Sequence, residues 1–278
     1  MTRVVRTRAA LRTALEASPH PIGLIPTMGW LHEGHRTLIA RGRMENATTV
    51  VSIFVNPRQF EDPSDLGQYP RNEDRDVAMC QAEGVDLVFA PSVTEIYAPG
   101  FDTVVSVGAI ARPLEGAARP GHFDGVATVV SVLFGLVRAE RAYFGQKDAQ
   151  QVAVIRRMAL DLALPTEVIA CPTVREPDGL AMSSRNVHLS PRERTAAAVL
   201  HRALERARRA WVAGERSADV LRGEMTAELA SEPLAAVDYV SCADAETLRE
   251  LSVVSGPAVL SLAVRIGSTR LIDNEVLD

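Results

Sequence analysis

The sequence has little of several features that mark whole classes of protein. Its 278 residues include only three cysteines, which are far apart and odd in number. Cys80, Cys171 and Cys242 therefore fit the reduced thiols of a cytoplasmic protein, not a disulfide framework. No run of about 18 apolar residues occurs, which excludes a membrane-spanning helix, and the first residues lack the apolar stretch of a signal peptide. We expect a cytoplasmic protein with no membrane partner.

A surplus of positive charge is also missing. The formal net charge is −5, which argues against a protein that coats nucleic acid. The zinc patterns Cys-x-x-Cys and His-Glu-x-x-His do not occur, and neither does the Gly-Lys-Ser/Thr ending of the common phosphate-binding loop. The chain does have 47% hydrophobic residues, which is enough for a sizeable core in one large or two ordinary domains.

Strand-like apolar runs alternate with helical stretches up to about residue 173. Val50-Val51-Ser52-Ile53-Phe54-Val55 is apolar at nearly every position, which indicates burial on both faces, as in a parallel sheet. The alternation predicts a doubly wound α/β domain with ligands at the carboxyl ends of its strands. The predicted strands are Ile22–Ile25, Thr48–Val55, Val85–Ala90, Thr103–Val107, Ala142–Phe144 and Thr166–Cys171, and the predicted helices include Arg36–Arg43, Arg71–Glu83, Gly125–Val137 and Asp148–Leu162.

A break that contains proline and glycine separates this region from a second one. The segment Ser190-Pro191-Arg192-Glu193 is a strong helix start, because it offers an N-cap serine, a proline in the first position and a glutamate in the third. It predicts a long helix to about Ala213, followed by a second helix, Ser217–Ala230. Short strands are predicted at Val237–Val240, Ala258–Val264 and Leu271–Ile272. This region therefore reads as a small α+β domain.

Two histidines lie three residues apart where a predicted strand gives way to a helix, in the segment Pro26–His35. The spacing puts the imidazoles of His32 and His35 on one face of the first helical turn, and a helix N-terminus binds anions. Gly29 and Gly34 would let the backbone approach a ligand. The pattern favours a site for nucleotide phosphates. It is also compatible with two surface histidines at a helix cap, or with a zinc site that lacks an evident third ligand.

Other polar segments carry chemistry of the same kind. In Gly145-Gln146-Lys147-Asp148 the lysine can meet a phosphate and the aspartate a ribose hydroxyl, although a glycine turn with a solvated lysine fits as well. Met182-Ser183-Ser184-Arg185-Asn186 suits a phosphate clamp on a loop that can close, or an ordinary helix-capping linker. Gln59 and Gln151 offer amides near two strand ends, which suit a small hydroxy-acid.

Taken together, these segments resemble the pantoate–β-alanine ligase family, the pantothenate synthetases. The resemblance covers nearly the whole chain in order and spacing. The matching stretches are Pro26–His35, Val51–Pro57, Gln59-Phe60, Tyr69–Arg71, Leu114–Gly116, Arg119–Phe123, Phe144–Asp148, Gln150-Gln151, Asp178–Asn186 and Leu271–Asn274. The chain departs from the family pattern at Gln146, where glutamate is frequent, and at Trp30, where a smaller residue is usual.

The resemblance implies a Rossmann-like domain over residues 1–174 and a smaller C-terminal lid domain over residues 175–278. It also implies ATP-dependent condensation of pantoate with β-alanine to pantothenate, through a pantoyl adenylate, with release of pyrophosphate and AMP. The matching catalytic positions are His32, His35, Lys147 and Arg185, with His35 as a proton donor. The positions implied to bind ATP are Met28, Gly29, His32, His35, Gly145, Gln146, Lys147, Asp148, Val174, Met182, Ser183, Ser184 and Arg185, and those implied to bind pantoate are Gln59 and Gln151.

Metal and partner expectations follow from the same resemblance. Mg²⁺ would bridge the ATP phosphates and keep its waters, so few protein ligands are expected, with Asp76 as one candidate. A homodimer through the N-terminal domain is implied, with Arg119–Phe123 and Thr103–Val107 as candidate contacts, although the turn at Arg119 fits a structural corner equally. The apolar segment Gly125–Val137 must be buried on all sides, which a core helix explains as well as an interface does. Two other functions share parts of the pattern: a cytidylyl- or adenylyltransferase that keeps the nucleotide in its product, and a nucleotide-binding regulator without catalysis.

Overall fold

The computed structural model describes residues 1–60 and 63–278, which form two compact units. Unit 1 comprises Met1–Gly145 and Gln150–Cys171. Unit 2 comprises Gln146–Ala149 and Pro172–Asp278. The four residues that follow β5 thus belong to unit 2. The chain then returns to unit 1 at Gln150 and belongs to unit 2 from Pro172 onward. The predicted roles of the two domains stay predictions.

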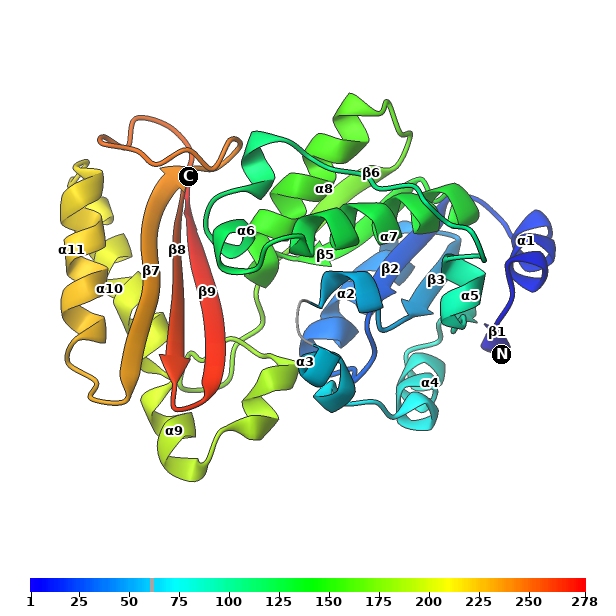
Figure 1. Cartoon of the computed structure of the whole chain (residues 1–278), viewed down its shortest axis with the longest axis horizontal. Helices are drawn as coiled ribbons and strands as arrows, with labels where there is room; N and C mark the ends of the chain where they lie inside the picture. The colour runs from blue at the N-terminus through cyan, green and yellow to red at the C-terminus, as the bar shows by residue number, and fades with distance from the viewer. Residues whose placement is uncertain (61–62) are drawn as a thin grey trace. The chain divides into compact units, whose positions relative to one another are not determined.

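Unit 1 is built on a six-stranded parallel sheet with the order β1-β4-β3-β2-β5-β6 (Figure 1). From β2 the chain steps outward to β3 and β4 on one side, and it later adds β5 and β6 on the other. The order therefore reverses between β2 and β5, and the carboxyl ends of strands at such a switch point are where open α/β sheets bind ligands. The strands are β1 (Arg3–Val5), β2 (Ile22–Thr27), β3 (Thr48–Ile53), β4 (Leu87–Phe89), β5 (Arg141–Gly145) and β6 (Glu167–Cys171).

Helices cover both faces of this sheet. Neighbouring residues of the central strands point to opposite sides, so each strand contributes side chains to both layers. Ile25 and Val51 join residues of α2 and α4 in one buried cluster. Leu24 and Val50 are fully buried as well and face the other side, where α7 contacts β2. The helices and helical turns of unit 1 are α1 (Arg8–Glu16), α2 (Glu33–Glu45), η1 (Pro57–Gln59), α3 (Pro63–Gln68), α4 (Glu73–Ala82), α5 (Val93–Ile96), η2 (Ala109–Ala111), α6 (Glu115–Ala118), α7 (His122–Val137) and α8 (Ala149–Asp161).

The structure confirms the predicted fold class and corrects one strand. Five predicted strands correspond to β2 through β6, but the strand predicted at Thr103–Val107 is wrong. The backbone N–H of Val105 donates to Thr128 Oγ1 on α7 (3.0 Å) instead of joining a ladder, and the Val104 side chain is exposed. The sixth strand is β1, which is only three residues long and exists through its pairing with β4.

Unit 2 holds an antiparallel sheet of β7 (Ala235–Asp244), β8 (Ala258–Ile266) and β9 (Thr269–Leu277) in sequential order. Helices α10 (Val199–Val212) and α11 (Ala218–Leu229) share one apolar core with this sheet (Figure 1). Unit 2 also contains the turns η3 (Gln146–Asp148) and η4 (Ser184–His188) and the helix α9 (Pro191–Ala196).

The helix start at Ser190 is confirmed, but the long helix that it was expected to open is interrupted. Ser190 Oγ accepts from Glu193 N–H (3.4 Å), and the Glu193 carboxylate accepts from Ser190 N–H (2.8 Å). The helix stops at Ala196, because Leu200 N–H bonds to the carbonyl three residues back, at Ala197, which tightens the turn before α10 begins.

Two findings concern the helices and the cysteines. None of the helices in residues 1–60 and 63–278 combines the length and apolar character needed to cross a bilayer. All three cysteines are free and buried. Burial raises the pKa of Cys80 to about 12 and that of Cys242 to about 11, so these thiols stay protonated and unreactive.

Candidate active site

The turn that follows β2 leads from the sheet into α2. Thr27 Oγ1 donates to the Ser52 carbonyl (2.7 Å) and accepts from Gly29 N–H (3.2 Å). Gly29 has a φ of 78°, which favours glycine, and a Cβ there would lie 2.9 Å from an oxygen of Asp76. Met28 and Gly29 therefore lie at the carboxyl end of β2, beside the switch point of the sheet.

His32 and His35 cap the start of α2 through a reciprocal pair of hydrogen bonds. The helix begins at Glu33, three residues earlier than predicted, with His32 as its N-cap. Nδ1 of His32 accepts from Gly34 N–H (3.1 Å), and Nδ1 of His35 accepts from His32 N–H (3.3 Å). The ring centroids are 4.2 Å apart. A Cβ at Gly34 would lie 2.9 Å from His32 Cε1, so glycine leaves the space that the ring occupies.

This capping pattern assigns the tautomer of both histidines. Because each Nδ1 accepts a backbone N–H, the proton of each neutral imidazole lies on Nε2. Two Nε2–H donors on one turn add to the partial positive charge of the helix N-terminus. The cap and the anion site are therefore not alternatives, since one nitrogen of each ring caps the helix and the other is a donor of the kind that phosphoryl oxygens require.

A buried amide network holds Gln59 at the carboxyl end of β3. Asn56 Nδ2 donates to Gln59 Oε1 (3.1 Å) and to the Gly125 carbonyl (3.0 Å), and Tyr97 Oη donates to Asn56 Oδ1 (2.7 Å). Gln59 Nε2 lies 3.0 Å from Met28 Sδ, so the structure brings a predicted pantoate residue and a predicted nucleotide residue together. Burial raises the pKa of Tyr97 to about 12, which keeps its hydroxyl a donor.

Sequence reasoning missed the residues that hold Gln59. Asn56 and Tyr97 orient its side chain, and His122 Nδ1 and Arg119 Nη2 contact its backbone carbonyl at 2.9 and 3.2 Å. The position of Asn56 directly after an apolar strand was a usable signal, because polar groups at strand ends gather at the ligand edge of a parallel sheet. The turn Arg119–Phe123 thus has a role inside the subunit, and its predicted dimer contact stays a prediction.

Gln151 and its neighbour have different surroundings at the start of α8. Gln151 is half-buried. Gln150 is buried: its Oε1 accepts from Glu115 N–H (2.9 Å), and its Nε2 donates to the carbonyls of Ile110 (3.0 Å) and Pro113 (2.8 Å). Gln150 therefore fixes the segment before α6, while Gln151 stays the predicted substrate residue. Gly145 ends β5, at the other side of the switch point.

Lys147 lies in η3, within unit 2, and is held by its backbone. Asn274 Nδ2 of β9 donates to the carbonyls of Gln146 (3.0 Å) and Lys147 (2.9 Å), and Gln146 Nε2 donates to Asn274 Oδ1 (3.2 Å). The Lys147 side chain is 16% exposed and its Nζ lies 3.8 Å from Asp148 Oδ1. Lys147 is the only lysine among the 30 Lys and Arg residues of the chain. A compact ammonium at this position is therefore an exception to the chain's use of arginine.

The predicted phosphate clamp Met182–Asn186 also belongs to unit 2. Met182 N–H donates to the Val174 carbonyl (2.9 Å), Ser183 Oγ accepts from Arg185 N–H (3.2 Å), and Asn186 Nδ2 donates to the Ala181 carbonyl (3.1 Å). Ser183 and Ser184 are half-buried and Arg185 is exposed. The segment is thus placed mainly by bonds between residues close in sequence, and it presents hydroxyl and guanidinium donors.

The carboxylate of Asp76, the candidate magnesium ligand, is bonded to the backbone of the turn after β2. It lies in α4, is 1% exposed, and its two oxygens accept the backbone N–H groups of Trp30 (2.7 Å) and Leu31 (2.8 Å). Residues 1–60 and 63–278 contain no group of three His, Cys, Asp or Glu side chains able to hold a metal ion. The zinc alternative for the histidine pair finds no third ligand there.

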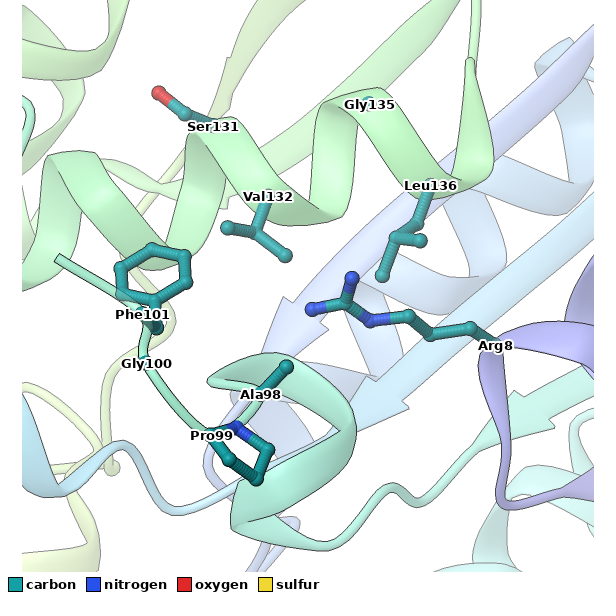
Figure 2. Close-up of a pocket in the computed structure, with 9 residues that line it drawn as sticks. All are labelled: Arg8, Ala98, Pro99, Gly100, Phe101, Ser131, Val132, Gly135 and Leu136. Atoms are coloured by element: carbon teal, nitrogen blue, oxygen red, sulfur yellow. The ribbon is translucent and has the colours of Figure 1, made fainter. Parts of the chain in front are cut away.

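A separate hollow of about 450 Å³ lies between α7 and the loop after α5 (Figure 2). Val132 and Leu136 of α7 and Phe101 of the loop after α5 line it, together with Arg8. The Arg8 guanidinium is engaged, because it donates to the carbonyls of Glu95 and Ile96. None of the predicted site residues lines this hollow.

The family model for pantoate-beta-alanine ligase matches residues 3–276. The chain belongs to this family. It is 60% identical to the pantothenate synthetase of Roseiflexus sp. (strain RS-1) over 276 residues, which cover 99% of each chain. The crystal structure of pantothenate synthetase from Thermus thermophilus has 49% identity and a TM-score of 0.94 over 98% of both chains. The Francisella tularensis pantoate-beta-alanine ligase, complexed with beta-gamma ATP and beta-alanine, has 32% identity and a TM-score of 0.81, over 99% of this chain and 98% of that one.

Membership in the pantoate–β-alanine ligase family confirms the family resemblance, the fold class and the ligase class. An enzyme is therefore confirmed over a regulator without catalysis. The predicted site residues stay predictions, and the geometry above is what any assignment of their roles must satisfy.

Proposed function

We propose that the chain condenses pantoate with β-alanine to pantothenate, using ATP and passing through a pantoyl adenylate. The observation that carries this proposal is the pair of Nε2–H donors, His32 and His35, on the first turn of α2 beside the switch point. Family membership supports it, and so does the Francisella tularensis relative, whose structure holds an ATP compound and β-alanine.

The chemistry needs an activated acyl group, because a carboxylate is a poor electrophile. In the first step a pantoate carboxylate oxygen attacks the α-phosphorus of ATP, and the bond from that phosphorus to the pyrophosphate oxygen breaks. In the second step the amine of β-alanine attacks the acyl carbon. The bond from that carbon to the AMP oxygen then breaks, and the amine nitrogen loses a proton. Pantothenate and AMP are released.

Charge grows on phosphoryl oxygens in the first step, so fixed donors are the main catalytic requirement. We assign this role to His32 and His35, with Lys147, Ser183, Ser184 and Arg185 as further phosphate donors. The backbone of Met28, Gly29, Gly145, Gln146, Val174 and Met182 would contact the nucleotide, and Asp148 would accept from the ribose hydroxyls.

Pantoate carries hydroxyls and a carboxylate, which call for groups that both donate and accept. The Gln59 amide fits this need, since Asn56 fixes its orientation by donating to Oε1. That bond leaves the second lone pair of Oε1 for a substrate, together with the Nε2 hydrogen that does not face Met28 Sδ. Gln151 is assigned the same function from the start of α8.

We expect magnesium to bind together with ATP, because the described residues do not provide a set of protein ligands for it. No cluster of three acidic, histidine or cysteine ligands exists in the described parts of the chain, and Asp76 uses both oxygens for backbone N–H groups. An ion held by phosphates and waters fits that composition. When bound, it would reduce the negative charge of the phosphates.

We also propose a cytoplasmic homodimer joined through the N-terminal domain. Helix α7 is buried on one side within one chain, at Val126, Val130 and Phe134. Val132 and Leu136 are half-buried and Gly135 is exposed, so the expected burial on all sides is not met within one chain. A sedimentation experiment at micromolar concentration should give the mass of a dimer. A monomer, or a dimer joined through residues 190–278, would contradict the proposal.

An assay with omitted substrates tests the reaction. With ATP, Mg²⁺ and pantoate alone, we expect one equivalent of pyrophosphate per enzyme and no continuing AMP release. Adding β-alanine should start steady AMP release with equal pantothenate. A product that retains the nucleotide would instead favour a cytidylyl- or adenylyltransferase, and ADP with inorganic phosphate would exclude an adenylate.

A further inference from the structure

The turn between β2 and α2 contains two consecutive residues in the left-handed region. Gly29 has a φ of 78° and Trp30 a φ of 51°. Glycine adopts this conformation freely, but a tryptophan has a Cβ and does not. A backbone held in this region persists only where its surroundings determine it, and such positions gather at functional sites. Something outside the turn must therefore hold Trp30.

Asp76 of α4 provides that hold from a buried position. Its Oδ2 accepts from Trp30 N–H at 2.7 Å, and its Oδ1 accepts from Leu31 N–H at 2.8 Å. The carboxylate is 1% exposed and lies so close to Gly29 that a Cβ there would approach Oδ2 to 2.9 Å. One carboxylate thus binds two consecutive residues of the turn and lies close to the glycine before them.

Arg75, the neighbour of Asp76, contacts the same turn. Its Nη2 donates to the Leu31 carbonyl at 3.0 Å, and its guanidinium lies 4.8 Å from the centroid of the Trp30 ring. Both backbone groups of Leu31 are therefore bonded to α4, one to Asp76 and one to Arg75. The next residue is His32, the N-cap of α2.

We propose that Asp76, assisted by Arg75, is a positioning residue that places the Nε2–H donors of His32 and His35 against the reacting phosphate. We assign it no contact with the substrate or the metal, because its carboxylate is 1% exposed and each of its oxygens already accepts a backbone N–H of the turn. The kinetic part of this inference rests on the proposed function, whereas the structural part does not.

The test is Asp76→Asn, with Asp86→Asn as the matched control. Asparagine has only one acceptor oxygen. Its NH₂ group would therefore face the backbone N–H of either Trp30 or Leu31, so that two donors would oppose each other. Asp86 also accepts a backbone N–H, from Thr49 at 2.8 Å, but it does so before β4 at the amino ends of the strands. The two variants therefore make the same chemical change at opposite edges of one sheet.

For Asp76→Asn we expect adenylate formation in a single turnover, at saturating ATP and pantoate, to fall about 10²-fold, as a small displacement of catalytic groups can cause. The dissociation constants of ATP and pantoate should stay within about threefold, since the lost contribution arises in the transition state. Half-saturation by Mg²⁺ should not move. Asp86→Asn should keep the wild-type rate.

Imidazole nitrogen NMR of the free protein gives a readout that does not use activity. In the wild type, the signals of His32 and His35 should show the Nε2–H tautomer. In Asp76→Asn these two signals should move toward mixed tautomers, while those of the other histidines stay in place. Arg75→Ala should shift the same two signals by less. It also serves as the second variant, because Arg75 is partly exposed and its loss leaves the buried carboxylate intact.

Three results would overturn the proposal. Unchanged His32 and His35 signals together with a wild-type rate would remove Asp76 from any positioning role. Recovery of the Asp76→Asn rate by excess Mg²⁺ would make Asp76 a metal ligand. Equal rate losses in Asp76→Asn and Asp86→Asn would reduce its effect to general stability. A wild type that forms no adenylate would contradict the proposed function instead, and the NMR comparison would still decide the role of Asp76.

Discussion

The two segments that carry most of the predicted phosphate donors are held in different ways. Around His32 and His35 in unit 1, the decisive bonds come from α4, more than 40 residues away in sequence. The segment Met182–Asn186 in unit 2 is placed by bonds to residues at most eight positions away. The first segment is preorganised by the sheet and its helices. The second has the properties of a segment that can rearrange when a ligand binds.

The largest expected effect is that of His35→Ala. Loss of one preorganised donor costs about 10²–10³ in rate, so adenylate formation in a single turnover should fall by that factor while ATP binding changes little. His20→Ala is a suitable control, because His20 pairs with Glu140 before β2, at the amino ends of the strands. Near-normal adenylate formation in His35→Ala would show that the rigid segment is not the catalytic one.

Lys147→Ala should lower the rate similarly and weaken ATP binding more than His35→Ala does. A hydrogen bond to a charged group contributes about 1.5–3 kcal/mol, which corresponds to roughly 10- to 150-fold in the ATP dissociation constant. Arg192→Ala, an exposed cation of unit 2, is the control. Unchanged affinity and rate would remove Lys147 from the site.

The single lysine allows a second test without mutation. An amine-acylating reagent can modify only Lys147 and the terminal amine in this chain. Bound ATP should protect Lys147 but not the terminus. Equal modification of Lys147 with and without ATP would contradict its assignment.

Gln59→Ala and Gln151→Ala should weaken pantoate binding and leave ATP binding nearly intact. Each lost buried hydrogen bond costs on the order of 1–3 kcal/mol. Calorimetry with pantoate and with ATP separates the two affinities, and Gln81→Ala on the exposed side of α4 is the control. Loss of ATP affinity with normal pantoate binding would make the assignment wrong.

The smallest expected effect concerns exchange of backbone amides. The amide of Leu31 is bonded to a buried carboxylate, whereas that of Arg185 is bonded to a serine hydroxyl in a half-exposed segment. In the free protein we expect Arg185 to exchange faster, and an ATP analogue should slow Arg185 more than Leu31. Equal protection of the two segments before ligand is added would remove the difference between them.

Much of this comparison could be predicted from the sequence, because apolar runs and strand-end polar residues are local signals. They placed β2 through β6 and the histidine pair. They could not find β1, whose three residues form a strand only by pairing with β4. They also could not tell that Asp76 is buried: an acidic residue in the first turn of a helix is usually solvated, and its partners Trp30 and Leu31 become visible only in three dimensions.

Local signals were also insufficient to predict the orientation of the Gln59 side chain and the interruption of the helix after Ser190. The Gln59 amide could be predicted as a substrate group, but its orientation depends on Asn56 and Tyr97, which come from different elements. The helix after Ser190 has a clear start signal. Its interruption at Ala197 results from the hydrogen bond of Leu200 N–H to the carbonyl three residues back, and no residue in this segment signals such a break.

The route of the pantoate oxygen tests the central claim most directly. Pantoate labelled with ¹⁸O in its carboxylate should transfer one labelled oxygen to AMP for each pantothenate formed, because the oxygen that attacks the α-phosphorus leaves with AMP. The other labelled oxygen should remain in the amide carbonyl of pantothenate. Label in inorganic phosphate, or unlabelled AMP alongside labelled water, would contradict a pantoyl adenylate.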